Sequence, residues 1–455
     1  MAEREFDVVV IGAGSSGEVC AGRVADGGLE VAIVEDNLVG GECSYYACMP
    51  SKALLRPAEV LAEVRRVPGA AQAVTGELDV AAALSRRDDV IDHLDDERQL
   101  GWLDAKGIEL VRGDARLDGE RRVAVGDDVL VGRKAVVVAT GTRPAIPPID
   151  GLADAEPWGN EEATTAKRAP QRLLVLGGGA VGVEMAQAWK SLGSRVALVE
   201  AADRILPGEE PFASEQVADG LRGDGVELHV GAKATAVRGG DGEVRLELEG
   251  GDELRGEQLL VAVGRDPRTD DIGLESVGIE PGGFLDVDDQ LRVGGSDWLY
   301  AVGDVNGRAL LTHMGKYQGR IAGDHILGKD VAATSERGGS PRVVFTSPQV
   351  AAVGHTLEQA KEDGIEARAV DVETSANAGA SFHGRNMPGT TRLVVDESRR
   401  VLVGATFVGP ETADFLHAAT IAVVGEVPLE RLWHAVPSFP TRSEVWLKLL
   451  EEYGL

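Results

Sequence analysis

The sequence of 455 residues predicts an α/β fold with two strand–turn–helix–strand units, followed by an α+β part at the C-terminal end. Two observations predict these units: glycine-rich turns at residues 12–17 and at residues 177–182 each follow directly after an apolar run. A third observation predicts the last part: short β-rich runs alternate with helical patterns beyond residue 337, and no third glycine turn appears there. At about 150 residues per domain, the length allows about three domains.

The first unit begins with the apolar run at residues 8–11, continues with Gly12, Gly14 and Gly17, and reaches Glu35 at the end of the next apolar run. In such a unit the first glycine makes the tight turn, the second lets a pyrophosphate approach the backbone, and the third lets the helix pack close to the strand. The helix N-terminus receives the phosphates, and the acid accepts hydrogen bonds from ribose hydroxyls. The pattern predicts a Rossmann-like dinucleotide site.

The second unit repeats the pattern, with the apolar run at residues 172–176, the glycines Gly177, Gly179 and Gly182, and the acid Glu200. In both units the acid follows the first glycine by 23 residues. One glycine triplet is weak evidence, and a glycine-rich turn without a ligand is the alternative. Two triplets, each with a strand before it and an acid after it, predict two dinucleotide sites.

A cysteine pair follows the first unit, at Cys43 and Cys48. Two cysteines five apart at the start of a helix can close a small, strained disulfide that is easily reduced. The positive end of the helix lowers the pKa of a thiolate there, which favours a nucleophilic sulfur. The pair predicts a disulfide that carries electrons, with two inert buried thiols as the alternative. The third cysteine, Cys20, is expected to be a small buried hydrophobic residue.

The composition excludes several classes of function. The formal net charge of -29 argues against nucleic acid or an anionic membrane as a partner. The apolar runs are only strand-length and the first strand begins near Met1, so we expect neither a membrane span nor a secretion signal. Three cysteines without further ligands predict no metal site. A reactive disulfide of this kind fits the cytoplasm, where such bonds are usually catalytic.

Other segments predict how the chain passes between domains. The apolar runs at residues 136–141 and 259–265 each end in glycine and are expected to close the two nucleotide-binding units. A further strand at residues 299–304 ends in an acid. Linkers are expected near residues 144–150 and 337–341, where Pro and Gly cluster.

These motifs, in this order and spacing, closely resemble the flavin-dependent pyridine nucleotide–disulfide oxidoreductases, whose type members are dihydrolipoyl dehydrogenase, glutathione reductase and mercuric reductase. The resemblance covers essentially the whole chain. It implies an FAD domain in two pieces, residues 1–150 and 269–336, with an NAD(P) domain at residues 151–268 inserted between them. It also implies a dimerisation domain at residues 337–455 and a homodimer, since the family's active site draws residues from both subunits.

The resemblance also implies the cofactor-binding residues. Glu200 would bond the 2′-hydroxyl of NADH and repel the 2′-phosphate of NADPH, so we expect NADH to be preferred, with NADP possible; Arg204 stands at a position that is basic in either kind. Asp304 would bind the ribityl or pyrophosphate region of FAD, and the segment 311–313 would run beside the flavin ring. The full set for FAD and NAD comprises Gly12, Gly14, Gly17, Glu35, Gly41, Thr140, Gly141, Gly177, Gly179, Gly182, Glu200, Gly264, Asp304, Leu311, Thr312 and His313.

The same resemblance implies the catalytic roles. Cys43 would be the interchange thiol that meets the substrate, and Cys48 would lie nearer the flavin as the charge-transfer thiolate. Lys52 would approach flavin N5 and pair with Glu184. The alternatives are a solvated helix lysine and a glutamate that faces solvent.

The chain departs from the family at its C-terminal signature, His-x-His-Pro-Thr-x-Ser-Glu, whose second histidine is the proton-handling base. Aligned on Pro437, that histidine is replaced by Val436, and three extra residues precede the Ser-Glu pair. Valine cannot move the protons that thiol–disulfide exchange requires. Either His434, oriented by Glu444, takes over this role, or both residues have only structural roles.

A second departure lies between the two cysteines, where most relatives have small residues and this chain has Tyr45 and Tyr46. Their rings could stack on a flat acceptor such as a quinone, or they could pack in the core.

Three functions follow from these expectations. The first is an NAD(P)H-dependent FAD disulfide oxidoreductase, similar to dihydrolipoyl dehydrogenase, that acts on a small disulfide or dithiol such as lipoamide or a low-molecular-weight thiol disulfide. The alternative, suggested by Val436, is a diaphorase-like reductase of a quinone, a metal ion or oxygen. The third is a flavoprotein that retains the fold without catalysis.

Overall fold

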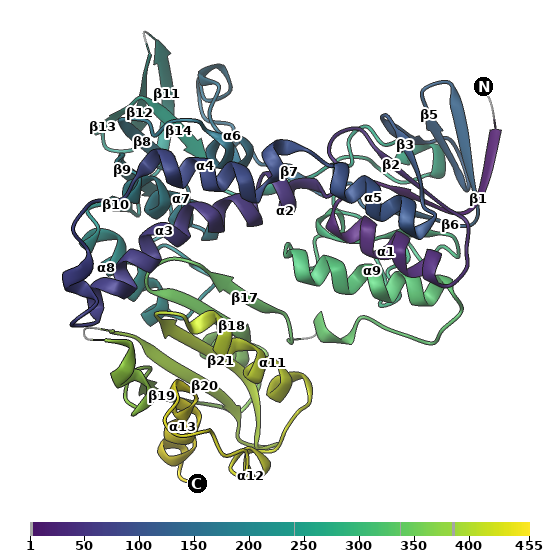
Figure 1. The fold of residues 1–455 in the computed structure, drawn as a ribbon. Helices are drawn as coiled ribbons and strands as arrows, with labels where there is room; N and C mark the ends of the chain where they lie inside the picture. Colours follow the sequence, from purple (N-terminus) through teal and green to yellow (C-terminus); the bar gives the residue numbers. More distant parts are fainter. Residues whose placement is uncertain (1–2, 241, 337, 385–386) are drawn as a thin grey trace. The chain divides into compact units, whose positions relative to one another are not determined.

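The computed structural model describes residues 3–240, 242–336, 338–384 and 387–455 (Figure 1). The chain forms two compact units, each built from three stretches of sequence. Unit 1 comprises Met1–Pro50, Arg87–Ala145 and Gly264–Glu336, and unit 2 comprises Ser51–Arg86, Ile146–Val263 and Arg337–Leu455. Within the described residues, no helix has the length and apolar character needed to cross a membrane.

Unit 1 is built on a seven-stranded sheet in the order β3-β2-β1-β6-β5-β4, with β16 also paired to β6. β1 runs parallel to both β2 and β6, so the carboxyl ends of these three strands lie at one edge of the sheet. Figure 1 shows α1 and α9 side by side in this unit. The strands are β1 (Glu3–Ile11), β2 (Val31–Glu35), β3 (Glu109–Arg112), β4 (Ala115–Leu117), β5 (Arg122–Val125), β6 (Asp128–Val138), β7 (Thr142–Pro144), β15 (Arg265–Pro267) and β16 (Leu299–Ala301), and the helices are α1 (Ser15–Asp26), α2 (Gly41–Tyr45), α5 (Glu97–Lys106) and α9 (Thr312–Ile326).

Unit 2 contains a second parallel sheet, in the order β10-β9-β8-β14, beside the three-stranded antiparallel sheet β11-β12-β13. The helices α3 (Cys48–Arg66) and α4 (Val80–Val90) each begin in one unit and end in the other. The elements of the nucleotide-type part are β8 (Arg172–Leu176), β9 (Arg195–Glu200), β10 (Glu227–Val230), β11 (Ala234–Gly240), β12 (Glu243–Leu248), β13 (Glu253–Gly256), β14 (Gln258–Val261), α6 (Asn160–Thr165), α7 (Ala180–Ser191) and α8 (Pro211–Gly223).

The C-terminal part of unit 2 is a five-stranded antiparallel sheet in the order β17-β18-β21-β20-β19. Apolar residues of α11 and α13 pack against this sheet around the buried ring of Phe407. The expected α+β character of this part is therefore found. Its elements are β17 (Pro341–Val344), β18 (Gln349–Gly354), β19 (Ala367–Glu373), β20 (Thr390–Asp396), β21 (Val401–Gly409), α10 (Leu357–Glu362), α11 (Leu416–Val424), α12 (Leu429–Leu432) and α13 (Val445–Tyr453).

The two glycine turns have the same packing. Gly12 and Gly177 take φ angles of 99° and 109°, which an L-residue with a side chain rarely adopts. A Cβ atom on Gly17 would lie 2.1 Å from the carbonyl oxygen of Gly12, and one on Gly182 would lie 1.9 Å from that of Gly177. Each helix therefore starts in direct backbone contact with the end of the preceding strand, as the spacing predicts.

We expect Gly182→Ala to destabilise the protein by about 3 kcal/mol, because the new methyl group has no space beside the Gly177 carbonyl. Thermal and urea unfolding measure the effect. Gly179→Ala is the matched control: a Cβ there meets nothing within 4 Å and φ is -73°, so its unfolding should match wild type. Equal stability of the two variants would contradict the assigned packing.

Candidate functional site

In unit 1, the turn after β1 and the end of β2 form one cradle through Glu35. Its Oε2 atom accepts a hydrogen bond from Ala13 N at 2.7 Å, and its Oε1 atom accepts one from Asn37 N at 2.9 Å. Burial raises the pKa of Glu35 to about 7, although these two hydrogen bonds act in the opposite direction. The carboxylate thus fixes the glycine turn relative to the next strand.

The cradle has space for a ligand at Gly14 and Gly41. A Cβ on Gly14 would meet only the Cα of Gly41, at 3.9 Å, whereas one on Gly41 would lie 2.7 Å from the Cα of Gly14. The two backbones therefore approach closely with no side chain between them, at the first turn of α1. Backbone N–H groups at a helix start favour phosphate, so these residues fit the pyrophosphate of a dinucleotide such as FAD.

Unit 2 repeats this arrangement at Glu200. Its Oε2 atom accepts a hydrogen bond from Gly178 N at 2.6 Å, and its Oε1 atom accepts one from Ala202 N at 2.7 Å. A Cβ atom built on Gly179 would meet no atom within 4 Å, so the space beside this residue is open. The second cradle thus has the same carboxylate contacts as the first and fits a second dinucleotide such as NAD(P)H.

The structure brings the two cysteines together in unit 1. Cys43 lies in α2, Cys48 is the first residue of α3, and both are free thiols joined by a hydrogen bond. Cys48 Sγ lies 3.3 Å from the hydroxyl oxygen of Thr312, the first residue of α9. This is the dithiol form of the pair, placed at the start of a helix.

The hydrogen bond with Cys48 and burial raise the pKa of the Cys43 thiol. Thr312 and the ammonium group of Lys316 act in the opposite direction. Thr312 and Lys316 are four residues apart on α9 and therefore share one face of the helix. Sequence reasoning missed Lys316, because nothing in its local pattern separates it from an ordinary helix lysine.

The third cysteine behaves as expected. Cys20 is 0% exposed among apolar residues of α1, β1 and β2. Burial raises its pKa to about 12, which keeps it an unreactive thiol.

The two tyrosines between the reactive cysteines are buried and form a small cluster with Ile91. The hydroxyl group of Tyr45 lies 3.1 Å from the Val39 carbonyl oxygen and 3.3 Å from that of Asp95, and it donates to these acceptors. The core-packing alternative therefore holds for both rings. Stacking on a flat acceptor is not supported, because neither ring is open to solvent.

Lys52 and Glu184 also lie together, both in unit 2. Lys52 Nζ donates to Glu184 Oε2 at 2.7 Å, and the Glu184 side chain on α7 is buried. Glu184 therefore does not face solvent.

A network of hydrogen bonds and ion pairs joins Glu42 of α2 to the paired strands β7 and β15 of unit 1. The sequence did not predict this network. Arg265 forms an ion pair with Glu42, and its Nη2 atom donates to the Thr142 carbonyl oxygen at 2.9 Å. The Thr142 hydroxyl donates to Asp304 at 3.3 Å. Burial raises the pKa of Asp304, while Arg265 and Thr142 act in the opposite direction. The one feature of the sequence that could have pointed to this network is the acid Glu42, directly before Cys43.

The other predicted cofactor residues lie at turns of unit 1. Gly141 and Gly264 take φ angles of 69° and 154° beside the antiparallel strands β7 and β15, and the Thr140 hydroxyl donates to the Arg268 carbonyl oxygen at 2.9 Å. Leu311 stands directly before α9, and His313 is exposed in the first turn of that helix.

The C-terminal residues do not form the expected pair. Glu444 stands directly before α13, and its Oε2 atom accepts a hydrogen bond from Gly379 N at 3.3 Å. The His434 ring is exposed and makes no hydrogen bond to any residue that the structure describes. The side chain of Val436 is 84% exposed and that of Phe439 is 77% exposed. Pro440 to Glu444 also matches the Pro-Thr-x-Ser-Glu part of the signature without a gap, which would place Phe439 at the histidine position. In either register an apolar side chain stands there.

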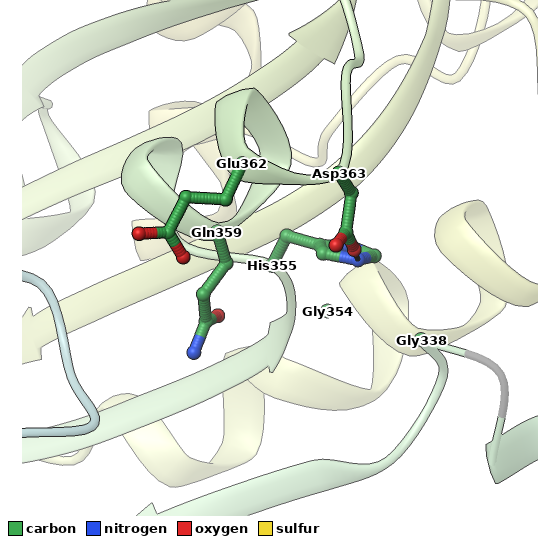
Figure 2. Close-up of a pocket in the computed structure, with 6 residues that line it drawn as sticks. All are labelled: Gly338, Gly354, His355, Gln359, Glu362 and Asp363. Carbon is green, nitrogen blue, oxygen red and sulfur yellow. Dashed lines mark hydrogen bonds and ion pairs between the residues drawn. The ribbon is translucent and has the colours of Figure 1, made fainter.

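A hollow of about 300 Å³ lies at α10 in the C-terminal part (Figure 2). Figure 2 shows the His355 ring beside the Asp363 carboxylate, and His355 Nε2 lies 3.0 Å from Asp363 Oδ2. None of the residues that line this hollow belongs to the predicted site: Gly338, Gly354, His355, Gln359, Glu362 and Asp363.

Two family models match the chain. The pyridine nucleotide-disulphide oxidoreductase model matches residues 6–319, and the dimerisation-domain model of the same family matches residues 340–450. The chain belongs to the pyridine nucleotide-disulphide oxidoreductase family, a family of FAD-dependent, NAD(P)H-linked enzymes. The predicted fold class, with N-terminal redox domains and a C-terminal dimerisation domain, is thereby confirmed.

Particular relatives carry more than one name. Dihydrolipoyl dehydrogenase of Haloferax volcanii is 32% identical over 462 residues, covering 98% of this chain and 95% of the relative. Mercuric reductase of Acidithiobacillus ferrooxidans is 32% identical over 440 residues, covering 94% and 79%. The HOCl-induced flavoprotein disulfide reductase RclA from Escherichia coli aligns with a TM-score of 0.86 at 26% identity, covering 98% and 99%, and a Cu(II) complex of it is also similar.

We expect Lys316→Met to slow alkylation of Cys43 by iodoacetamide about threefold at neutral pH in the dithiol-reduced protein. Loss of the cation removes an effect that lowers the Cys43 pKa, so less thiolate is present at a given pH and the rate profile moves to higher pH. Mass spectrometry of labelled peptides measures the rate. The control is Lys106→Met, which removes a lysine of α5 that pairs with Asp26 of α1; the alkylation rate of Cys43 should then match wild type. Identical Cys43 rates in wild type and Lys316→Met would contradict the assigned role.

Proposed function

We propose that this protein is an NADH-dependent FAD disulfide reductase that uses Cys43 and Cys48 to reduce a small disulfide, such as oxidised lipoamide or a low-molecular-weight thiol disulfide. The observation that carries the proposal is the hydrogen-bonded dithiol of α2 and α3, which contacts the first residue of α9 in the same unit as the first cradle. The FAD domain would comprise residues 1–150 and 269–336, the NAD(P) domain residues 151–268, and the dimerisation domain residues 337–455.

The two sulfur atoms would complete the reaction in two exchange steps. The Cys43 thiolate attacks one sulfur of the substrate disulfide, so that a mixed disulfide forms and the first substrate thiol leaves with a proton. Cys48 then attacks the Cys43 sulfur, which releases the second thiol and closes the Cys43–Cys48 disulfide. The substrate gains two electrons and the pair loses two. FAD bound at Gly14 and Glu35, with NADH, would supply the electrons that restore the dithiol.

The proposed chemistry needs a proton to leave Cys43. Cys43 must lose its proton before it attacks, and its contact with Cys48 and its burial oppose that loss. Neither Val436 nor Phe439 can act as a base, and Glu444 does not orient His434. Lys316 would therefore stabilise the Cys43 thiolate by its charge, without accepting a proton.

The preference for NADH follows from the second cradle. Glu200 keeps a carboxylate where the ribose hydroxyls of NADH would bind, and this charge would repel a 2′-phosphate. Arg204 donates to the carbonyl oxygens of Glu209 and Pro207 at 3.0 and 2.7 Å, so its guanidinium is engaged by the loop. No other group of this loop is proposed to bind a 2′-phosphate.

A second function, reduction of a soft metal ion, is favoured by the sulfur atoms at this site. Cys43 and Cys48 are adjacent thiols, and the thioether side chain of Met49 follows them at 49% exposure. Thiolate and thioether groups prefer soft metals. Relatives named mercuric reductase support this choice. Quinone reduction loses the argument from ring stacking, because Tyr45 and Tyr46 are buried, and keeps only the argument from the missing histidine.

We expect Cys43→Ser to lower NADH-dependent reduction of small disulfides at least about a hundredfold, because serine cannot form the mixed disulfide. NADH oxidation is followed with oxidised lipoamide and other low-molecular-weight disulfides, in parallel with Hg(II) and Cu(II). Cys20→Ala removes the buried thiol and should keep wild-type turnover. Unchanged turnover of every disulfide in Cys43→Ser would refute the proposal. Turnover of metal ions alone by the wild type would select the second function.

We expect Glu200→Ser to lower the ratio of kcat/KM for NADH over NADPH about tenfold or more, since the repulsion of a 2′-phosphate is removed. Steady-state kinetics with both nucleotides measure the ratio. Glu227→Ser, on the next strand β10, is the charge-matched control and should leave the ratio unchanged. A wild-type preference for NADPH would count against the assignment.

A further inference from the structure

Phe345 contacts both members of the Lys52–Glu184 ion pair. Its backbone N–H donates to Glu184 Oε1 at 2.9 Å, and the centre of its ring lies 4.7 Å from Lys52 Nζ. Glu184 Oε2 accepts from Lys52 at 2.7 Å, so each of the three groups contacts the other two. All three residues lie in unit 2.

The backbone contact completes the hydrogen bonding of a buried carboxylate. Glu184 is only 5% exposed, and Lys52 occupies one of its two oxygen atoms. A buried carboxylate oxygen without a donor is costly, and the Phe345 N–H supplies that donor. Glu184 is therefore held from two sides and cannot turn without losing a hydrogen bond.

The segment that carries Phe345 is itself fixed on α7. Gln187, three residues after Glu184 on that helix, accepts a hydrogen bond from Ser347 N at 2.7 Å, and its amide group donates to Asp224 at 2.6 Å. Residues 345–347 thus follow the face of α7 that carries Glu184 and Gln187. The position of the Phe345 ring is set by this backbone attachment.

The ring restricts the ammonium group of Lys52. Lysine has a flexible four-carbon stem, and one ion pair leaves the ammonium free to move around the carboxylate. A cation within about 6 Å of an aromatic face is attracted by the ring's quadrupole, which removes much of that freedom.

We propose that Phe345 is a positioning residue of the Lys52 site, which holds Glu184 through its backbone and the Lys52 ammonium through its ring. Phe345 lies in the part of the chain that matches the dimerisation-domain model, so that domain contributes within its own subunit to the site of Lys52. The proposal relies on the proposed function only for what Lys52 does, because the contact itself does not depend on any substrate.

The test is brief acetylation of the FAD-loaded protein with acetic anhydride, with labelling of Lys52 quantified by mass spectrometry relative to Lys448 on α13. In Phe345→Leu, which keeps the backbone N–H and loses the aromatic face, Lys52 should react about fivefold faster. Phe345→Tyr keeps the face and should restore the wild-type rate. Phe212→Leu is the matched control, because it removes a half-buried ring that contacts Arg392, and Lys52 should then react as in wild type.

Equal Lys52 labelling in wild type, Phe345→Leu and Phe345→Tyr would overturn the proposal. If Phe345→Leu does not fold, Phe345→Met provides a second side chain without a ring and must give the same acceleration. Faster labelling in Phe345→Tyr as well would also overturn it, because the ring face would then have no effect. Acetylation needs neither NADH nor an acceptor. A failure of the disulfide reductase proposal would therefore not change the acetylation result, and a failure of the acetylation test would not count against the disulfide reductase proposal.

Discussion

The contact between the first and third glycines of each turn is the constraint on which both nucleotide units depend. Because Gly17 lies against the Gly12 carbonyl and Gly182 against that of Gly177, each helix begins at the carboxyl edge of its parallel sheet. The acid that ends the next strand then reaches the N–H groups of the same turn. Each acid, as Glu35 does in unit 1, thus fixes both the glycine turn and the loop after the next strand, and it leaves the helix N-terminus open to phosphate.

The dithiol combines a suitable position with an unfavourable protonation. Contact with Cys48 and burial raise the pKa of the Cys43 thiol, while Thr312 and Lys316 act in the opposite direction. A member of this family with a C-terminal histidine would remove the proton with that base, whereas this chain has apolar groups in either register. In the proposed function, fixed charge near the sulfur atoms would take the place of that base, and acceptors that react with a thiol pair without a proton donor, such as soft metal ions, would then be favoured.

The residues around the pair have mostly structural roles. Tyr45 anchors the redox segment to the chain near Asp95, and Arg265 ties Glu42 to the crossing strands. In unit 2, Phe345 links the dimerisation-type sheet to Lys52. Each of these contacts joins segments more than forty residues apart in the sequence, so the local geometry in each unit depends on packing within that unit.

The sequence alone determined the fold class, the two glycine cradles with Glu35 and Glu200, and the family, because spacing along a strand, a turn and a helix fixes these features locally. It also paired Lys52 with Glu184, but only through the resemblance to a family. The tertiary structure decided the questions that spacing leaves open: Tyr45 packs in the core of unit 1, and Glu444 contacts Gly379 instead of His434. It also places Lys316 near Cys43 in unit 1 and Phe345 against Lys52 in unit 2. The physical reason is that burial and charge at these positions come from segments distant in the sequence, which local periodicity does not encode.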